Sequence, residues 1–259
     1  MQNYALRIGL KGGHRDYVRF IILGRSRSGS NFLRGLLNSH SQIKVFGELF
    51  QNEAGIGWAM PGYRESGPVF SRFRQHPVEF LERDVFTRVP PEITAVGFKI
   101  FYYHAQSPNW KSIWDYLRDH KAIHVLHIKR KNILATHLSR KLAVQSDQWV
   151  NTTGERQQVK SVNLDFQECL DDFTRTREWE NEYEQYFKEH PYMDVFYEDL
   201  AADHAAEMLR VQQFLGVSPE RLEPETFRQS RRPLAELIVN YQELKDRFTG
   251  TPWQTFFES

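Results

Sequence analysis

Cysteine is almost absent from this sequence: Cys169 is alone among 259 residues, which excludes an internal disulfide framework and suits a reducing compartment. No apolar run approaches the roughly 18 residues of a membrane-spanning helix, and the first residues lack the apolar core of a secretory signal. An excess of either charge is also missing, with 34 basic and 33 acidic residues, so nothing favours nucleic acid or an anionic membrane as a partner. We therefore predict a cytoplasmic protein without a transmembrane segment; its oligomeric state stays open.

Internal repeats and low-complexity tracts are missing as well, and what remains is an alternation of two kinds of segment. Short apolar runs read as buried strands, and amphipathic stretches between them read as helices. Strands that alternate with helices form a parallel sheet, which binds ligands at the carboxyl ends of its strands. We predict one α/β domain over residues 1–259, with a central parallel sheet of about five strands flanked by helices. The strands are expected at 18–23, 42–46, 96–101, 122–128 and 193–197, and the helices at 32–37, 76–87, 110–120, 133–145, 164–190, 200–215 and 234–248.

Residues 24–31, GRSRSGSN, connect the first predicted strand to the helix that follows it. A glycine-containing loop in this place aims backbone N–H groups and the positive end of a helix dipole at one point, which attracts a phosphate-like group. A P-loop kinase or ATPase would have Lys and then Ser or Thr after the second glycine, to hold the phosphates and Mg²⁺. Here Ser30 and Asn31 stand in those positions, and the cation of the loop is Arg27, before Gly29. An enzyme that uses ATP and Mg²⁺ remains an alternative, although these groups are missing.

The loop R-S-x-S-G-S-N, followed by F-L-x-x-L-L, resembles the 5′-phosphosulfate loop of sulfotransferases that use 3′-phosphoadenosine 5′-phosphosulfate (PAPS). The run from SHS at 39–41 to GELF at 47–50 is similar to the bacterial carbohydrate branch, of the trehalose and lipopolysaccharide type. The resemblance covers residues 18–253 and implies PAPS as donor, no metal, a P-loop-like fold and a saccharide or glycolipid acceptor. It also implies that the 5′-phosphosulfate group is held by Arg25, Ser26, Arg27, Ser28, Gly29, Ser30 and Asn31.

A second basic motif, HIKRKNILATHLS, runs from the fourth predicted strand into the next helix. Its Arg130 and Ser139 can face a single anion, and the motif resembles the 3′-phosphate site of the same family. Nearer the C-terminus, Arg228 resembles a basic residue that approaches the cofactor in the carbohydrate branch. The YEDL motif at 197–200 resembles a family signature too, and we expect its carboxylates to hold loops in place.

Sulfuryl transfer resembles phosphoryl transfer, an in-line displacement that depends on positioning and charge stabilisation. We expect Arg27 to act at the leaving oxygen, and the acceptor hydroxyl needs a base. Glu48 follows the second strand at the same edge of the sheet as the loop, and it matches the glutamate that the carbohydrate branch uses as base. His104, after the third strand, is the reserve base. The structural alternative is that Glu48 only pairs with Arg25 or Arg34.

Three histidines that lie close in sequence, His120, His124 and His127, raise the question of a metal. On a strand, residues 124 and 127 point to opposite faces because their separation is odd, so we expect no metal site. The acceptor is expected to meet residues 51–95 and 145–165, and the glycines and aromatic residues of 51–75 suggest an ordered lid. Neither segment contains a motif that names the acceptor, and a non-catalytic binder of PAPS-like nucleotides or sulfated glycans stays an alternative.

Overall fold

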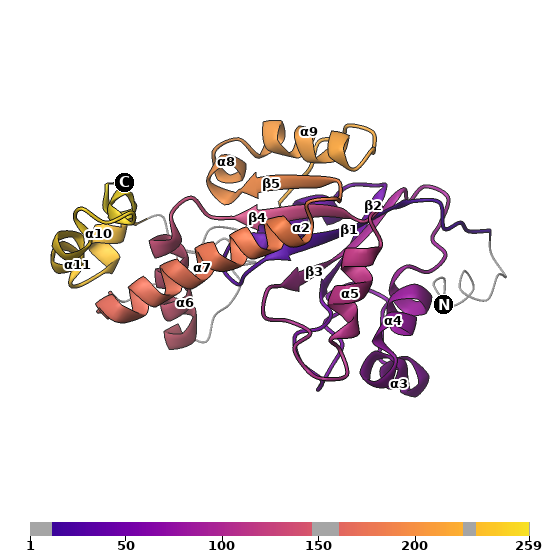
Figure 1. Cartoon of the computed structure of the whole chain (residues 1–259). Helices are drawn as coiled ribbons and strands as arrows, with labels where there is room; N and C mark the ends of the chain where they lie inside the picture. Colours follow the sequence, from indigo (N-terminus) through magenta and orange to yellow (C-terminus); the bar gives the residue numbers. More distant parts are fainter. Residues whose placement is uncertain (1–11, 147–160, 225–231, 259) are drawn as a thin grey trace.

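The computed structural model describes residues 12–146, 161–224 and 232–258, and Figure 1 shows them arranged around one sheet. The sheet has five strands in the order β2-β3-β1-β4-β5, and every neighbouring pair is parallel. This confirms the predicted α/β class and the parallel sheet of about five strands. The strands are β1 Val18–Gly24, β2 Ile43–Glu48, β3 Ala95–Phe101, β4 His124–Lys129 and β5 Tyr192–Phe196.

Helices connect these strands and cover both faces of the sheet (Figure 1). Alternate residues of β1 point to opposite sides, as the pleat of a strand requires. Ile21 and Leu23 face the side that α4, α5 and the end of α7 cover, whereas Phe20 and Ile22 face α2 and α9. The helices are α2 Ser30–Asn38, α3 Gly67–Gln75, α4 Pro77–Phe80, α5 Ser112–Asp119, α6 Ile133–Ser146, α7 Phe166–Tyr186, α8 Tyr197–Ala202, α9 His204–Phe214, α10 Leu234–Leu237 and α11 Tyr241–Phe248, with a π-helical turn at Leu81–Val85 and a 3₁₀ turn at Gln254–Phe257.

The segment that follows β2 differs from its prediction. Residues 51–75 end in α3, and the predicted helix at 76–87 is the short α4 continued by a π-helical turn. Trp58 is only 6% exposed, and its ring lies 5.2 Å from that of Phe46 and 5.3 Å from that of Phe80. Trp58, one of the aromatic residues that suggested a lid, is therefore part of the core. Its large ring is buried against other rings beside the sheet.

The C-terminal helix predicted at 234–248 is two helices, α10 and α11, because Ile238–Asn240 leave the helical conformation. Figure 1 shows this pair at one end of the molecule, beside α6 and α7. There Leu237, Leu244 and Phe248 form a third apolar cluster with Ile133 of α6 and Phe173 of α7. Within the described ranges, no helix is both long enough and apolar enough to cross a bilayer.

Candidate active site

The loop between β1 and α2 is shaped by two residues in the left-handed region of backbone space. Arg27 has φ 66° although it is not a glycine, a conformation that L side chains rarely adopt and that is concentrated at functional sites. Gly29 has φ 99°, and a Cβ placed on it would come within 2.3 Å of the Tyr197 ring. Ser28 closes the turn by donating from Oγ to the Arg25 carbonyl over 2.8 Å. The loop thus carries its N–H groups to the start of α2, where an anion is stabilised.

The two predicted phosphate motifs meet at this loop. Arg27 Nε donates to Ser139 Oγ over 2.9 Å, and Arg130 Nε lies 3.5 Å from the Arg27 carbonyl oxygen. Burial, with the positive charge of Arg130 nearby, lowers the pKa of Arg27, yet a guanidinium stays protonated at neutral pH. Two guanidinium groups and one hydroxyl are thereby gathered at the carboxyl ends of β1 and β4. Like charges are brought this close at sites where an anion offsets their repulsion.

Tyr197 and Glu198 hold the second motif in place. The Arg130 Cζ lies 3.9 Å from the centre of the Tyr197 ring, a cation–π contact, and Arg130 Nη1 is 3.7 Å from Glu198 Oε1. Glu198 also accepts a hydrogen bond from the Lys131 backbone N–H over 3.0 Å, at the start of α6. Tyr197 is therefore wedged between Gly29 of the loop and Arg130. The expectation that the YEDL carboxylates hold loops in place is confirmed for Glu198.

The Arg25 side chain points away from the α2 end of the loop and into the protein. Its guanidinium is 4% exposed and points to α7, where Nη2 pairs with Asp172 Oδ1 over 2.9 Å and Nη1 donates to Thr176. Asp172 in turn binds Arg140 of α6 over 2.8 Å. These contacts fix the loop to α7 and use the Arg25 guanidinium inside the protein. We therefore leave the Arg25 side chain out of the donor-binding residues proposed below.

Glu48 lies beside the loop because β2 and the segment after it hold its backbone. The pairing of β2 with β3 is irregular between Phe46 and Glu48, and Glu48 is opposite Lys99. Gly57 packs so closely there that a Cβ would lie 2.2 Å from the Glu48 carbonyl oxygen. The Glu48 Oε1 accepts from Lys99 Nζ over 2.9 Å, and the same ammonium also donates to Asn31 Oδ1 of α2. One ammonium therefore joins the expected base to the helix that follows the β1–α2 loop.

The structural alternative for Glu48 was a pair with Arg25 or Arg34; its carboxylate pairs with Lys99, while Arg25 pairs with Asp172. Sequence analysis missed Lys99. It is the only charged residue of β3, a strand buried along its whole length, and is itself 2% exposed. Burial lowers the pKa of Lys99, and the Glu48 carboxylate opposes that effect. A lysine within an apolar strand was the signal available, because lysine is almost never fully buried unless it is paired.

His104 also approaches Glu48, with its Nε2 3.9 Å from Oε2. Its Nδ1 accepts a hydrogen bond from the Phe101 backbone N–H over 3.2 Å, which assigns the proton of the neutral ring to Nε2. Burial lowers the pKa of His104 to about 4, so the ring is neutral at physiological pH. On this side the neutral ring presents Nε2–H, which can donate to Glu48. Nε2 therefore has no lone pair with which to take a proton from an acceptor hydroxyl.

Comparison with protein families and with known proteins shows the family to which the chain belongs. A family model described as "Sulfotransferase family" matches residues 19–221. The chain belongs to the sulfotransferase family. The relatives include Nodulation protein H of Rhizobium tropici, 30% identical over 244 residues that make up 92% of each chain. Nodulation protein H of Rhizobium meliloti (strain 1021) is 28% identical over 246 residues, 92% of this chain and 94% of the relative.

The fold of this sulfotransferase is also found in a solved structure. The crystal structure of a sulfotransferase from Alicyclobacillus acidocaldarius superposes with a TM-score of 0.52 at 15% identity, and the match covers 93% of this chain and 94% of the other. At this identity the likeness concerns the fold alone. The resemblance to a bacterial sulfotransferase family is thereby confirmed, and the kinase and non-catalytic interpretations are left without support.

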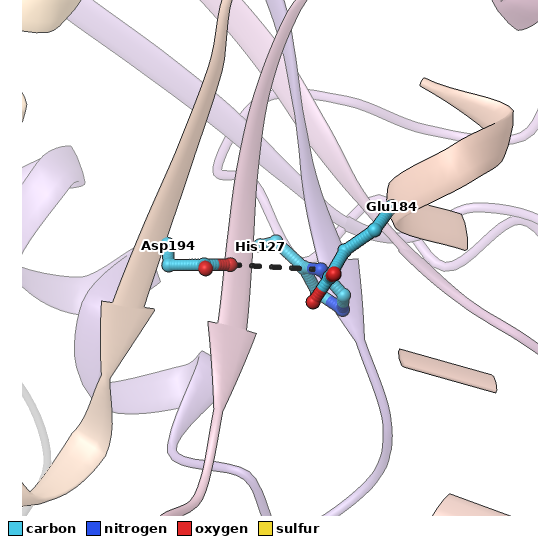
Figure 2. A group of neighbouring side chains, drawn as sticks. All are labelled: His127, Glu184 and Asp194. Atoms are coloured by element: carbon cyan, nitrogen blue, oxygen red, sulfur yellow. Dashed lines mark ion pairs between the residues drawn. The ribbon is translucent and has the colours of Figure 1, made fainter. Parts of the chain in front are cut away.

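A second polar cluster of the sulfotransferase lies between β4, β5 and α7, and Figure 2 shows its His127, Glu184 and Asp194. These three side chains have the ligand types of a metal site. However, Lys129 Nζ pairs with Glu184 and, over 2.6 Å, with Asp194. Both ring nitrogens of His127 contact tyrosine hydroxyls, those of Tyr102 and Tyr192. The Lys129 ammonium therefore supplies the positive charge that the two carboxylates require, and this cluster of side chains does not fit a metal ion.

His124 and His127 lie on opposite faces of β4, as expected from their spacing. His124 contacts Phe214 of α9, whereas His127 contacts the tyrosines on the side of α7. Burial and then the Lys129 charge hold the pKa of His127 well below its usual range. Two other predictions lie outside the described residues: the role of Arg228, and the acceptor contacts of residues 147–160.

Proposed function

We propose that this sulfotransferase moves a sulfuryl group from PAPS to a hydroxyl of a saccharide or glycolipid, with Glu48 as general base. The observation that carries the proposal is the Lys99 ammonium, which contacts Glu48 Oε1 over 2.9 Å and Asn31 of the loop. It ties a carboxylate to the N-terminal turn of α2, next to the place where the anionic donor would lie. A base must be within hydrogen-bond reach of the proton that it takes, and this contact supports that position for Glu48.

The donor would bind across the loop and the start of α6. The N–H groups of residues 27–31 would hold the 5′-phosphosulfate, and Arg130 with Ser139 would hold the 3′-phosphate. Arg27 Nε lies 2.9 Å from Ser139 Oγ, so this guanidinium would lie between the two proposed anion sites. In that place it can stabilise the negative charge that grows on the leaving 5′-phosphate oxygen.

The reaction itself is a displacement at sulfur. The acceptor oxygen forms a bond to sulfur while the bond from sulfur to the 5′-phosphate oxygen breaks, and Glu48 takes the hydroxyl proton. The products are a sulfate ester and adenosine 3′,5′-bisphosphate. The buried Lys99 ammonium contacts Asn31 and Glu48, so it would lie beside the reacting groups, where positive charge favours a transition state rich in negative oxygen.

The saccharide acceptor rests on the resemblance of the 39–41 and 47–50 motifs to the carbohydrate branch. The location in the cytoplasm and the independence from metal belong to the same proposal and stay predictions.

The donor part is tested by calorimetric titration of adenosine 3′,5′-bisphosphate with EDTA and with Mg²⁺. We expect the same affinity in both conditions, and Arg130→Ala should weaken binding about 10- to 100-fold because a charge-assisted partner is lost. Arg210→Ala is the control, since Arg210 lies on α9 and pairs with Glu207 away from the loop. Unchanged affinity in Arg130→Ala, or binding only with Mg²⁺, contradicts the assignment. Transfer of ³⁵S from labelled PAPS to saccharides then tests the reaction.

A further inference from the structure

We propose that the acceptor sugar lies on an aromatic shelf formed by Tyr103 and Trp179, with Arg175 at its edge. The inference deepens the proposed function and rests on it, because the shelf lies between Glu48 and the β1–α2 loop proposed to bind the donor, here called the donor loop. It assigns an acceptor subsite to the end of β3 and the middle of α7. Neither residue belongs to a motif that the sequence identifies.

Tyr103 connects the donor loop to the expected base. Its hydroxyl oxygen accepts a hydrogen bond from the Ser26 backbone N–H over 3.0 Å. On its other side, the Tyr103 ring lies 5.3 Å from the ring of His104, whose Nε2 is 3.9 Å from Glu48 Oε2. A sugar ring placed on Tyr103 would therefore lie next to both the donor loop and the carboxylate.

Exposure distinguishes Tyr103 from the other phenylalanine, tyrosine and tryptophan residues that the structure describes. Tyr103 is 40% exposed, whereas its neighbour Tyr102 is buried and forms part of the core. The rings of Tyr103 and Trp179 are 5.8 Å apart, and Trp179 packs on Tyr102 from the α7 side at 5.7 Å. Trp179 is partly buried, so the core fixes its orientation while part of its surface remains exposed. Rigid, half-exposed rings are typical of binding surfaces rather than of packing alone.

The chemistry of the shelf matches a pyranose ring. Such a ring presents C–H groups on one face and hydroxyls around its rim, so it suits an aromatic face bordered by hydrogen-bond donors. Arg175 supplies the border, with its Cζ 5.9 Å from the centre of the Trp179 ring. Arg175 is mostly exposed and also pairs with Glu178 over 3.4 Å. An aliphatic chain would gain nothing from these charged groups, whereas sugar hydroxyls can bond to both.

Arg175 also lines an open groove of about 920 Å³ between α6 and α7, which extends the shelf. The other walls include His137, Arg140, Lys141 and Glu178. His137 Nδ1 is 3.0 Å from Asp172 Oδ2, and its buried Nε2 has no hydrogen-bond partner among the described residues. Nδ1 also lies 3.2 Å from Arg140 Nη2, so these contacts hold the His137 ring in place in the wall of the groove. A groove of this size, lined by charged side chains and by apolar surface, fits further sugar units, so the acceptor class is an oligosaccharide.

The test uses wild-type enzyme and variants with ³⁵S-labelled PAPS. The acceptors are tetrasaccharides of β-linked glucose, of β-linked N-acetylglucosamine and of α-linked glucose, each with its disaccharide. We expect the wild type to label at least one tetrasaccharide more efficiently than its disaccharide. Trp179→Ala should raise the acceptor KM about tenfold through loss of ring contact, with a smaller effect on kcat. The acceptor KM of Trp179→Phe should lie between those of the wild type and Trp179→Ala. Arg175→Ala should remove the advantage of the tetrasaccharide.

Two variants of Tyr103 separate its two contacts. Tyr103→Phe keeps the ring, so the acceptor KM should stay unchanged while affinity for adenosine 3′,5′-bisphosphate falls about two- to tenfold with the bond to Ser26. Tyr103→Ala should also raise the acceptor KM. Trp253→Ala is the control for loss of a partly buried tryptophan, because Trp253 packs in the C-terminal cluster. It should leave both constants unchanged.

The outcomes distinguish the shelf from the function on which it rests. If Trp179→Ala labels saccharides with the wild-type KM, the shelf is wrong and the proposed function stands. If the wild type binds adenosine 3′,5′-bisphosphate but labels no saccharide at millimolar concentration, the shelf and the saccharide acceptor both fail, and donor binding stands. If the bisphosphate does not bind, the proposed function itself fails.

Discussion

Replacement of Glu48 by glutamine is the most informative single change in this active site. Glutamine keeps the length of the side chain and an oxygen for Lys99 Nζ, which lies 2.9 Å from Glu48 Oε1, but it cannot take a proton at neutral pH. Because Glu48 is the last residue of β2 and its backbone is held by Gly57, the substitution should not move the chain. The expected loss is therefore the catalytic contribution of a general base.

The magnitude follows from the proposed role. A general base contributes about 10²–10⁴ in rate, or roughly 2.7–5.4 kcal/mol of transition-state stabilisation. We expect kcat to fall by about that factor, with the affinity for adenosine 3′,5′-bisphosphate changed by less than about threefold, since the proposed bisphosphate site is on the loop and α6 rather than on β2. Loss of the carboxylate charge also removes a partner of the buried Lys99 ammonium, and this lowers stability.

The assay has two parts. Labelled PAPS and a saturating acceptor give kcat, and calorimetry with the bisphosphate gives both affinity and the fraction of folded, binding-competent enzyme. Rates are then expressed per competent site, which separates a catalytic loss from partial unfolding. His104→Asn is the matched control, because the asparagine oxygen can replace Nδ1 as acceptor for the Phe101 N–H. More than about a tenth of wild-type turnover in Glu48→Gln, together with an inactive His104→Asn, would refute the reasoning and exchange the two roles.

Three further results are expected. Lys99→Met should lower both kcat and bisphosphate affinity, since Lys99 contacts Glu48 and Asn31. The effects of Lys99→Met and Glu48→Gln on kcat should be non-additive in a double-mutant cycle. Additive losses in kcat would contradict the proposal that Lys99 couples Glu48 to Asn31. Gly29→Ala should abolish bisphosphate binding because its Cβ would lie 2.3 Å from the Tyr197 ring. Gly216→Ala is the control, since Gly216 has φ 66° but open space around it, and it should only lower the unfolding midpoint. Equal losses of binding in the two variants would contradict this explanation. Burial lowers the His104 pKa from 6.5 to about 4, so between these pH values the unfolded state binds a proton that the folded state does not bind. The free energy of unfolding should therefore fall by about 3 kcal/mol as pH drops from about 6.5 to 4. Urea unfolding at pH 7.5 and 4 should show this loss in the wild type and a smaller one in His104→Asn, and equal losses in the two proteins would contradict the prediction.

Much of the architecture could be predicted because local patterns and strand order carry it. In β1 the apolar run is continuous, which indicates burial on both faces, and alternation with helices indicates parallel strands. At residues 51–75 the glycines and aromatic residues suggested an ordered lid, but the pattern did not show that Trp58 packs in the core. The prediction of one helix was wrong at 234–248, where the break at Ile238–Asn240 leaves no sequence signal such as proline. Burial against distant elements decided both.

The sequence by itself determined which chemistry gathers at the carboxyl ends of the strands. The order strand, glycine loop, helix places Arg27 and Asn31 at one edge of the sheet, and the strands before Glu48 and Arg130 end at the same edge, because parallel strands share a direction.

Only the tertiary structure decided which side chains meet there. Arg25 turns to Asp172 on α7, and Lys99 joins Glu48 to Asn31 across β2, β3 and α2. Tyr103 meets Ser26 on the other side of the loop. Residues so far apart in sequence are paired by the register of the strands and by the need of buried charges for partners, and neither is written in any local pattern of the chain.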